Sequence, residues 1–196
     1  PGDLYFEDVD GNGVVNDEDK RVIGSPHPDF TYGFAINTSY KQFDLRASFN
    51  GSQGNKVLDG YDYYLYNMEG SGNQYADVAQ RWRSSNNPGN GSVYRASRAG
   101  TQSNSTRLST FYLQDGSFLR MTNVTLGYNM PQGLSQKLKL SGVRIYASVE
   151  NPFTITKYKG YNPEPDYDQR GNLTPGVDYG LYPLVRGYNL GLKVTF

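Results

Sequence analysis

The chain has 196 residues, and its 19 basic and 19 acidic side chains leave no formal net charge. This balance argues against an electrostatic nucleic-acid binder, which needs an excess of positive charge facing the phosphates. The absence of cysteine excludes a disulfide scaffold and a cysteine-based zinc site. No run approaches the roughly 20 apolar residues of a membrane-spanning helix. The 18 tyrosines suit the aromatic girdles of a membrane β-barrel, or a carbohydrate-facing surface.

An acidic loop near the start of the chain has the ligand spacing of an EF-hand calcium loop, with Gly13 at the sharp-turn position. Oxygen ligands at alternate positions allow a short loop to wrap a Ca²⁺ ion. Asp19 stands where glutamate is usual, and its shorter arm alters how the loop closes. The alternative is a solvated acidic turn. We expect a structural Ca²⁺ site, whose predicted ligands are Asp8, Asp10, Asn12, the Val14 carbonyl, Asn16 and Asp19.

Five segments alternate large apolar residues with small or polar ones, which predicts antiparallel β-strands with one apolar and one polar face. The segments are 30–40, 43–50, 118–128, 143–149 and 186–196. Charged residues fall almost only on the polar faces, which favours a transmembrane barrel over a soluble β-sandwich, the alternative that alternation leaves open. Lysine at Gly191 should then be tolerated better than lysine at Leu192. The residues of the last strand expected to face lipid are Tyr188, Leu190, Leu192, Val194 and Phe196.

The connections between these strands alternate in length. Lys41-Gln42 is short and 129–142 is moderate, whereas 52–116 and 156–184 are long. Outer-membrane barrels have short periplasmic turns and long external loops, so we expect residues 1–29, with the calcium loop, and both long connections outside the cell. Five strands cannot close a barrel. The small number of strands, a first residue that is Pro1 and the lack of a signal peptide together indicate a piece of a longer protein.

Other candidate sites are weaker. Aromatic residues of the first long connection could contact a substrate or a partner, or could pack internally; they are Tyr61, Tyr63, Tyr64 and Trp82. Glu164, Asp166 and Asp168 could be imagined as a glycosidase pair, but turn residues are the better interpretation. His27 lies between prolines and reads as a loop residue. Because the common catalytic motifs are missing, we expect no enzyme activity.

Several stretches together resemble the C-terminal end of SusC/RagA-type TonB-dependent outer-membrane transporters of Bacteroidetes. The resemblance is weakest over 61–110, and Pro152 departs from it at a position where a larger apolar residue is expected. The stretches that carry it are 1–24, 25–57, Arg81-Trp82, 113–131, 143–165 and 176–196.

The resemblance implies an all-β chain that supplies about five C-terminal strands of a transmembrane antiparallel barrel, 22-stranded in the family. The plug domain lies outside this chain. Such transporters sit in the outer membrane, import glycan or peptide oligomers unchanged, and work with a SusD-like surface lipoprotein. TonB would act through the missing N-terminal region. The implied partners are the rest of the barrel and plug, the lipoprotein, TonB and outer-membrane lipid.

Two functions therefore follow from the sequence. The first is part of an importer, for which we expect a glycan more than a peptide. The second is a soluble extracellular β-domain, stabilised by calcium, that binds glycans or mediates adhesion.

Overall fold

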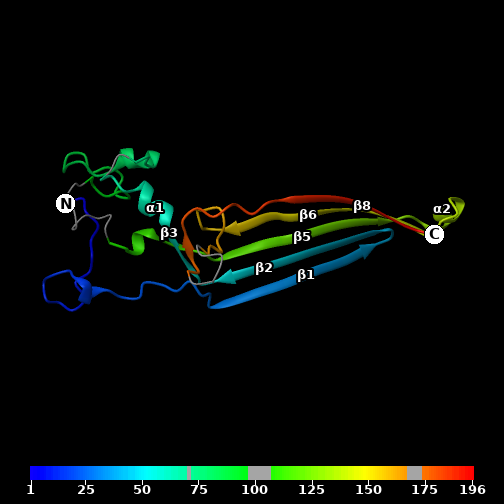
Figure 1. The fold of residues 1–196 in the computed structure, drawn as a ribbon, viewed down its shortest axis with the longest axis horizontal. Coiled ribbons are helices and arrows are strands. Elements are labelled where there is room, and N and C mark those ends of the chain that lie inside the picture. The colour runs from blue at the N-terminus through cyan, green and yellow to red at the C-terminus, as the bar shows by residue number, and fades with distance from the viewer. Residues whose placement is uncertain (70–71, 97–106, 167–173) are drawn as a thin grey trace.

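A long five-stranded antiparallel sheet forms the centre of the structure, with strands in the order β1-β2-β5-β6-β8 (Figure 1). The computed structural model describes residues 1–69, 72–96, 107–166 and 174–196. The strands are β1 (Phe30–Tyr40), β2 (Phe43–Gln53), β5 (Phe118–Asn129), β6 (Gly142–Thr156) and β8 (Gly187–Thr195). All five predicted strands are therefore present, and the prediction of an all-β chain is confirmed.

A second, small sheet joins β4 (Leu113–Asp115), β3 (Lys56–Asp59) and β7 (Val177–Asp178), and the sequence analysis did not predict it. Two short helices were also missed: α1 (Gly60–Leu65) and α2 (Gln132–Lys137). Single 3-10 turns occupy Asp17–Asp19, Ala76–Gln80 and Thr110–Tyr112. Across the described ranges, the helices are all too short or too polar to cross a membrane.

The sixth strand continues seven residues past its predicted end. Its ladder with β5 pairs Asn123 with Glu150 and resumes at Met121 with Phe153, so Asn151 and Pro152 fall in an irregularity. Asn151 has a φ of 47° there. A bulge of this kind absorbs a proline, which has no N–H to donate to the ladder. The departure at Pro152 therefore bends the strand without ending it.

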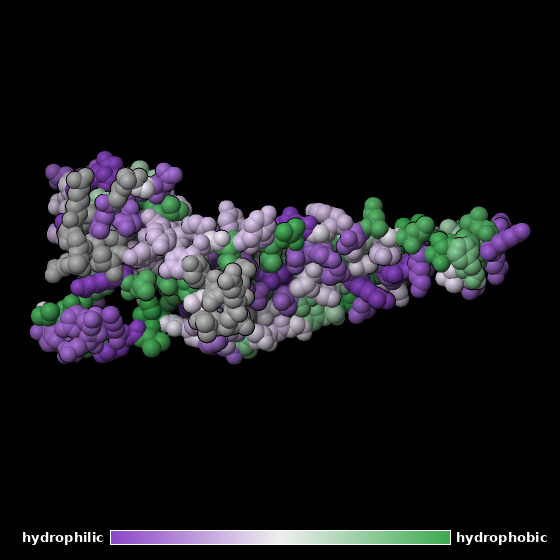
Figure 2. All heavy atoms as spheres, viewed as in Figure 1, coloured by the Kyte–Doolittle hydropathy of each residue, from purple (hydrophilic) through white to green (hydrophobic). Residues whose placement is uncertain are grey.

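The strand register confirms that one face of the sheet is apolar and the other polar. One row across β2, β5, β6 and β8 contains Leu45, Leu126, Ala147 and Leu190. The neighbouring row on the opposite face contains Arg46, Thr125, Ser148 and Asn189. Figure 2 shows hydrophobic residues exposed at points along the strands and gathered around α2. Leu190 is 87% exposed, so none of the described residues covers this part of the apolar face.

Glycines on the polar face make room for larger neighbours. Gly127 pairs with Asp44 and lies under the ion pair that Asp44 forms with Arg144, with 2.6 Å between Oδ2 and Nη2. A Cβ on Gly127 would stand 2.5 Å from atoms of both side chains. Gly191 likewise lies under the Tyr146 ring, 2.1 Å from where its Cβ would stand. Lysine at Gly191 would therefore have to displace that ring, and better tolerance at Gly191 than at Leu192 stays a prediction.

The two ends of the sheet differ. The tight turn between β1 and β2, helix α2 and the C-terminus lie at one end, and the N-terminus, α1 and the small sheet lie at the other. The left-handed Lys41, with a φ of 54°, closes the tight turn. Both long connections leave from the end opposite the C-terminus, so all the candidate sites in the connecting segments gather there.

Candidate functional sites

The acidic loop brings three of its predicted ligands together. Carboxylate oxygens of Asp8, Asp10 and Asp19 all lie within 4.8 Å of one another. The amides of Gly11 and Gly13 donate to the Asp8 carboxylate at 2.8 and 2.7 Å. Both glycines adopt positive φ, 75° and 85°, which lets the loop turn back on itself. The loop is thus folded around a point where three carboxylates converge.

Asp19 closes the loop through both of its oxygens. Oδ1 accepts the Val9 amide at 2.8 Å, and Oδ2 accepts the Asn16 amide at 2.7 Å. These backbone hydrogen bonds, that of Asn16 first, hold the pKa of Asp19 below its usual value. Asn16 in turn caps the 3-10 turn Asp17–Asp19, because its Oδ1 accepts the Glu18 amide at 2.6 Å. The aspartate therefore supplies the closing contact within a capping box.

The other predicted ligands are engaged within the loop. Asn12 Oδ1 accepts the Val14 amide at 2.8 Å, and its Nδ2 donates to Asp10 Oδ2 at 2.8 Å. The Asn16 side chain is used by its cap. Three hard carboxylate oxygens are nevertheless a donor set that suits Ca²⁺. The residues present fit a calcium ion, with Asp8, Asp10 and Asp19 as the charged ligands.

The acidic loop and the N-terminus are tied to the first long connection. The Arg107 guanidinium donates to the Val15 carbonyl at 3.4 Å and lies 5.2 Å from the centre of the Phe6 ring. Asp3 pairs with Arg95 at 2.7 Å. The Trp82 ring packs on Gly2, so close that a Cβ there would be 2.4 Å away. Trp82 therefore serves internal packing, one of the two alternatives for it.

The predicted tyrosines divide between packing and exposure. The Tyr63 ring contacts the Tyr64 and Tyr112 rings, each with centroids 5.5 Å apart. Tyr112 is fully buried, and the cluster continues through Phe111. Tyr61 and Tyr64 remain 40% and 61% exposed. Of the four aromatic candidates, these two are available for contact with another molecule.

A cleft of about 600 Å³ opens beside Tyr61. Its walls come from α1 and the preceding Asp59, from residues 75–77, from 159–161 and from Asp178. Gln114 Nε2 donates to Asp59 Oδ2 at 2.8 Å and to Asp62 Oδ2 at 3.1 Å. Burial raises the pKa of both carboxyls, and their mutual repulsion adds to the rise at Asp59. The cleft thus holds desolvated carboxyl groups whose charged form is disfavoured until a positive charge is near.

Sequence reasoning recognised only part of this cleft. The interleaving of tyrosine with Asp59 and Asp62 is visible in the chain, but Asp77, Lys159 and Asp178 come from separate segments. No local pattern links them. Only the parallel pairing of β3 with β7 brings Asp178 beside Asp59.

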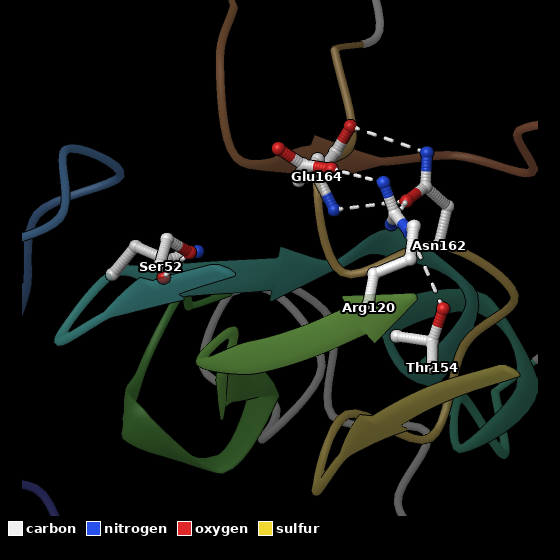
Figure 3. A network of polar contacts seen from close by, with 6 residues as sticks. Ser52, Arg120, Thr154, Asn162 and Glu164 are labelled. Carbon is white, nitrogen blue, oxygen red and sulfur yellow. Dashed lines mark hydrogen bonds and ion pairs between the residues drawn. The ribbon is translucent and has the colours of Figure 1, made fainter. Parts of the chain in front are cut away.

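The carboxylates considered as a glycosidase pair have other surroundings. Glu164 forms an ion pair with the buried Arg120, with 2.6 Å between Oε2 and Nη1. Arg120 also donates to Asn162 and Thr154, and Figure 3 shows these side chains converging on the guanidinium. Asp168 lies outside the described residues. Glu164 therefore anchors a loop, which supports its interpretation as a structural residue.

The comparisons with known proteins agree with this architecture, although no family model matches the chain. The TonB-dependent receptor P3 of Formosa agariphila is 38% identical over 201 residues, spanning 100% of this chain and 19% of the relative. The TonB-dependent receptor SusC of Bacteroides thetaiotaomicron is 34% identical over 198 residues, spanning 100% and 18%. The chain thus spans about a fifth of the length of these relatives.

Solved structures give the same result. The RagAB peptide importer in its closed-closed state superposes with a TM-score of 0.76 at 27% identity, over 96% of this chain and 20% of that one. Its open-open state gives 0.67 at 26% identity, over 90% and 18%. These relatives are receptors and importers, which confirms the expectation that the chain is not an enzyme. The chain belongs to the SusC/RagA-type TonB-dependent receptors and forms part of the C-terminal, all-β region of their barrel.

Proposed function

We propose that the full-length protein containing this chain is an outer-membrane importer of nutrient oligomers. The two-faced sheet carries this proposal: an apolar face whose side chains stay largely exposed among the described residues matches lipid, and a polar face matches a barrel lumen. The likeness to SusC and to the RagAB peptide importer supports it. The rival soluble β-domain would leave that apolar face in water, which disfavours it.

The proposal includes the partners and placement implied by the family. A SusD-like surface lipoprotein covers the barrel, TonB acts on a region outside this chain, and residues 1–29 and both long connections face the cell exterior. The gathering of these segments at the end opposite the C-terminus supports that arrangement. The oligomer is a glycan or a peptide.

Deletion of the parent gene tests import. Growth on one oligomeric or polymeric nutrient should be lost, while growth on the corresponding monosaccharide or amino acids stays intact, because only the oligomer needs the lidded barrel. Restoring the gene should restore growth. Unchanged growth and uptake across a broad panel, with the protein expressed, would contradict import and favour the adhesion domain.

We also propose that the Asp8–Asp19 loop binds a structural Ca²⁺ ion. The convergence of three carboxylates within 4.8 Å supports this. The ion would offset the mutual repulsion of these charges and hold the loop against Arg107 of the first long connection, which contacts Val15 and Phe6. The acidic loop would then hold the external segments together and would have no catalytic role.

Asp10→Ala should abolish calcium binding to the loop, because it removes one of the three converging carboxylates. In the full-length protein, removing calcium with a chelator should speed protease cleavage within residues 1–29 of the wild type. The variant should be cleaved rapidly with or without calcium, and its barrel should still assemble. Asp17→Ala is the control, since the Asp17 side chain is 91% exposed and pairs with Lys20. A wild-type cleavage rate indifferent to calcium would refute the site.

A further inference from the structure

The cleft beside α1 contains more negative charge than its surroundings neutralise. Four of its lining side chains are carboxylates and one, Lys159, is an ammonium; the carboxylates are Asp59, Asp62, Asp77 and Asp178. Three are almost fully buried, with exposures of 4% for Asp59, 8% for Asp62 and 2% for Asp178. Within the part of the chain that the structure describes, none of the four forms an ion pair.

Neutral donors hold most of these carboxylates in place. Asp178 accepts the Tyr158 hydroxyl at 2.6 Å and the Gly180 amide at 2.8 Å. Asp59 accepts the Tyr61 amide at 2.9 Å, besides the Gln114 amide. Such bonds fix the oxygens but supply no positive charge, so the ionised form of these buried carboxyls is costly until a cation is near. The arrangement is what a site for a cation requires before the cation arrives.

Asp77 adds an oxygen that has no internal use. Its Oδ2 accepts the Tyr66 hydroxyl at 2.7 Å. Its Oδ1 is buried and has no hydrogen-bond partner among the described residues. A buried carboxylate oxygen without a donor is rare in folded proteins. Because Asp77 lines the cleft, a ligand can satisfy this oxygen if the side chain turns toward the cleft.

The remaining residues that line the cleft offer apolar surface. Leu65 and Ala76 line it, and the rings of Tyr61 and Tyr161, 40% and 70% exposed, also contribute to the lining. Aliphatic and aromatic surfaces suit a methylene chain, and tyrosine faces attract a cation. A ligand that fits must therefore have a flexible apolar stem and a charged end.

We propose that this cleft is a subsite for a lysine or arginine side chain of an oligopeptide entering the transporter. The proposal rests on the proposed import function and deepens it by naming the substrate chemistry. The cationic end would meet the Asp77 carboxylate, whose Oδ1 would turn toward it, and the field of Asp59 and Asp62. The stem would lie along the Tyr61 and Tyr161 rings. A neutral sugar could use the same hydrogen-bond acceptors but would leave the buried charges unbalanced. The cleft thus favours a peptide, whereas the sequence led us to expect a glycan more than a peptide.

Peptide binding by the purified full-length transporter tests this subsite. The probes are a hexapeptide with one central lysine and the same peptide with norleucine, which keeps the stem and lacks the charge. The lysine peptide should bind at least about ten-fold more tightly, and the difference should shrink as salt rises. Equal affinities would overturn the proposal. A preference for a chitosan tetramer over its acetylated form, without any preference between the peptides, would overturn it in favour of an amino sugar.

The Asp77→Asn variant tests whether the preference for the lysine peptide arises in this cleft. The variant keeps an oxygen for the Tyr66 hydroxyl and removes the charge, so affinity for the lysine peptide should fall about ten-fold and affinity for the norleucine peptide should not change. Asp29→Asn, an exposed carboxylate outside the cleft, is the matched control. Equal losses in the two variants would contradict the site. Should Asp77→Asn fail to assemble, the comparison of the two peptides on the wild type still decides.

Failure of this subsite and failure of import are distinguishable. If both peptides compete equally for uptake of the nutrient, the subsite is wrong and import stands. If binding is selective for charge but gene deletion leaves growth unchanged on every oligomer, the subsite stands and import is wrong.

Discussion

Replacing Leu190 with lysine should cost about 2–4 kcal/mol of barrel stability, the cost of a lysine facing lipid near the bilayer midplane. Leu190 is 87% exposed on the apolar face. Its row contains Leu45, Leu126 and Ala147, whereas the row of Leu192 contains the aromatic Phe43 and Tyr128. Aromatic rows mark the interfaces of membrane barrels. Lysine at Leu192 should therefore cost less than lysine at Leu190.

Asn189→Lys is the matched control for this series. Asn189 is the immediate neighbour of Leu190 and lies on the polar face, with its Nδ2 3.5 Å from Glu150 Oε1. A lysine there would face a carboxylate in a polar lumen. Folded protein recovered from the outer membrane, and its resistance to heat unfolding, should follow the order Asn189→Lys, Leu192→Lys, Leu190→Lys, from least to most affected. Equal effects at Asn189 and Leu190 would mean that the two faces do not meet different surroundings.

The strands were predictable because each depends on a local pattern. Period-two alternation requires only neighbouring residues, and it placed the start of β1 and its end at Tyr40 correctly. It stopped early in β6, because Asn151 and Pro152 interrupt the alternation while the bulge keeps the strand going. At a bulge, pairing with the partner strand resumes after the irregular residues. The sequence of one segment alone does not show that this pairing exists.

The sites follow the same division. The acidic loop was recognisable because all its predicted ligands lie within twelve residues, and the structure brings Asp8, Asp10 and Asp19 together. The cleft depends on Asp59 and Asp178, which are brought together by a parallel pairing between distant segments. Which distant segments pair depends on the whole fold and cannot be read from either segment alone. The packed role of Trp82 was open for the same reason, because its partner Gly2 is eighty residues away.

The ion pair between the buried Arg120 and the half-exposed Glu164 gives the second large expected effect. The Arg120 side chain is 7% exposed, whereas the Glu164 side chain is 46% exposed. Glu164→Ala leaves a buried guanidinium without its counter-charge, and Asn162 and Thr154 offer only neutral acceptors. Removing one partner of a buried pair is strongly destabilising, so closure of the 157–166 segment over the sheet should weaken by about 3 kcal/mol.

Arg120→Met should cost less, about 1 kcal/mol, because the remaining Glu164 carboxylate is exposed enough to be hydrated and the methionine can pack beside Phe118. Amide hydrogen exchange of residues 157–166 in the full-length protein measures the free energy of local opening for each variant. Glu164→Gln, which keeps an oxygen for Arg120, should fall between the two. The order of the variants separates charge burial from simple loss of contacts: if the pair acted only as a contact, Glu164→Ala and Arg120→Met would open the segment equally. Removing the half-exposed Glu164 should therefore open the segment more than removing the buried Arg120. This order is expected only if the cost of burying an unpaired guanidinium dominates.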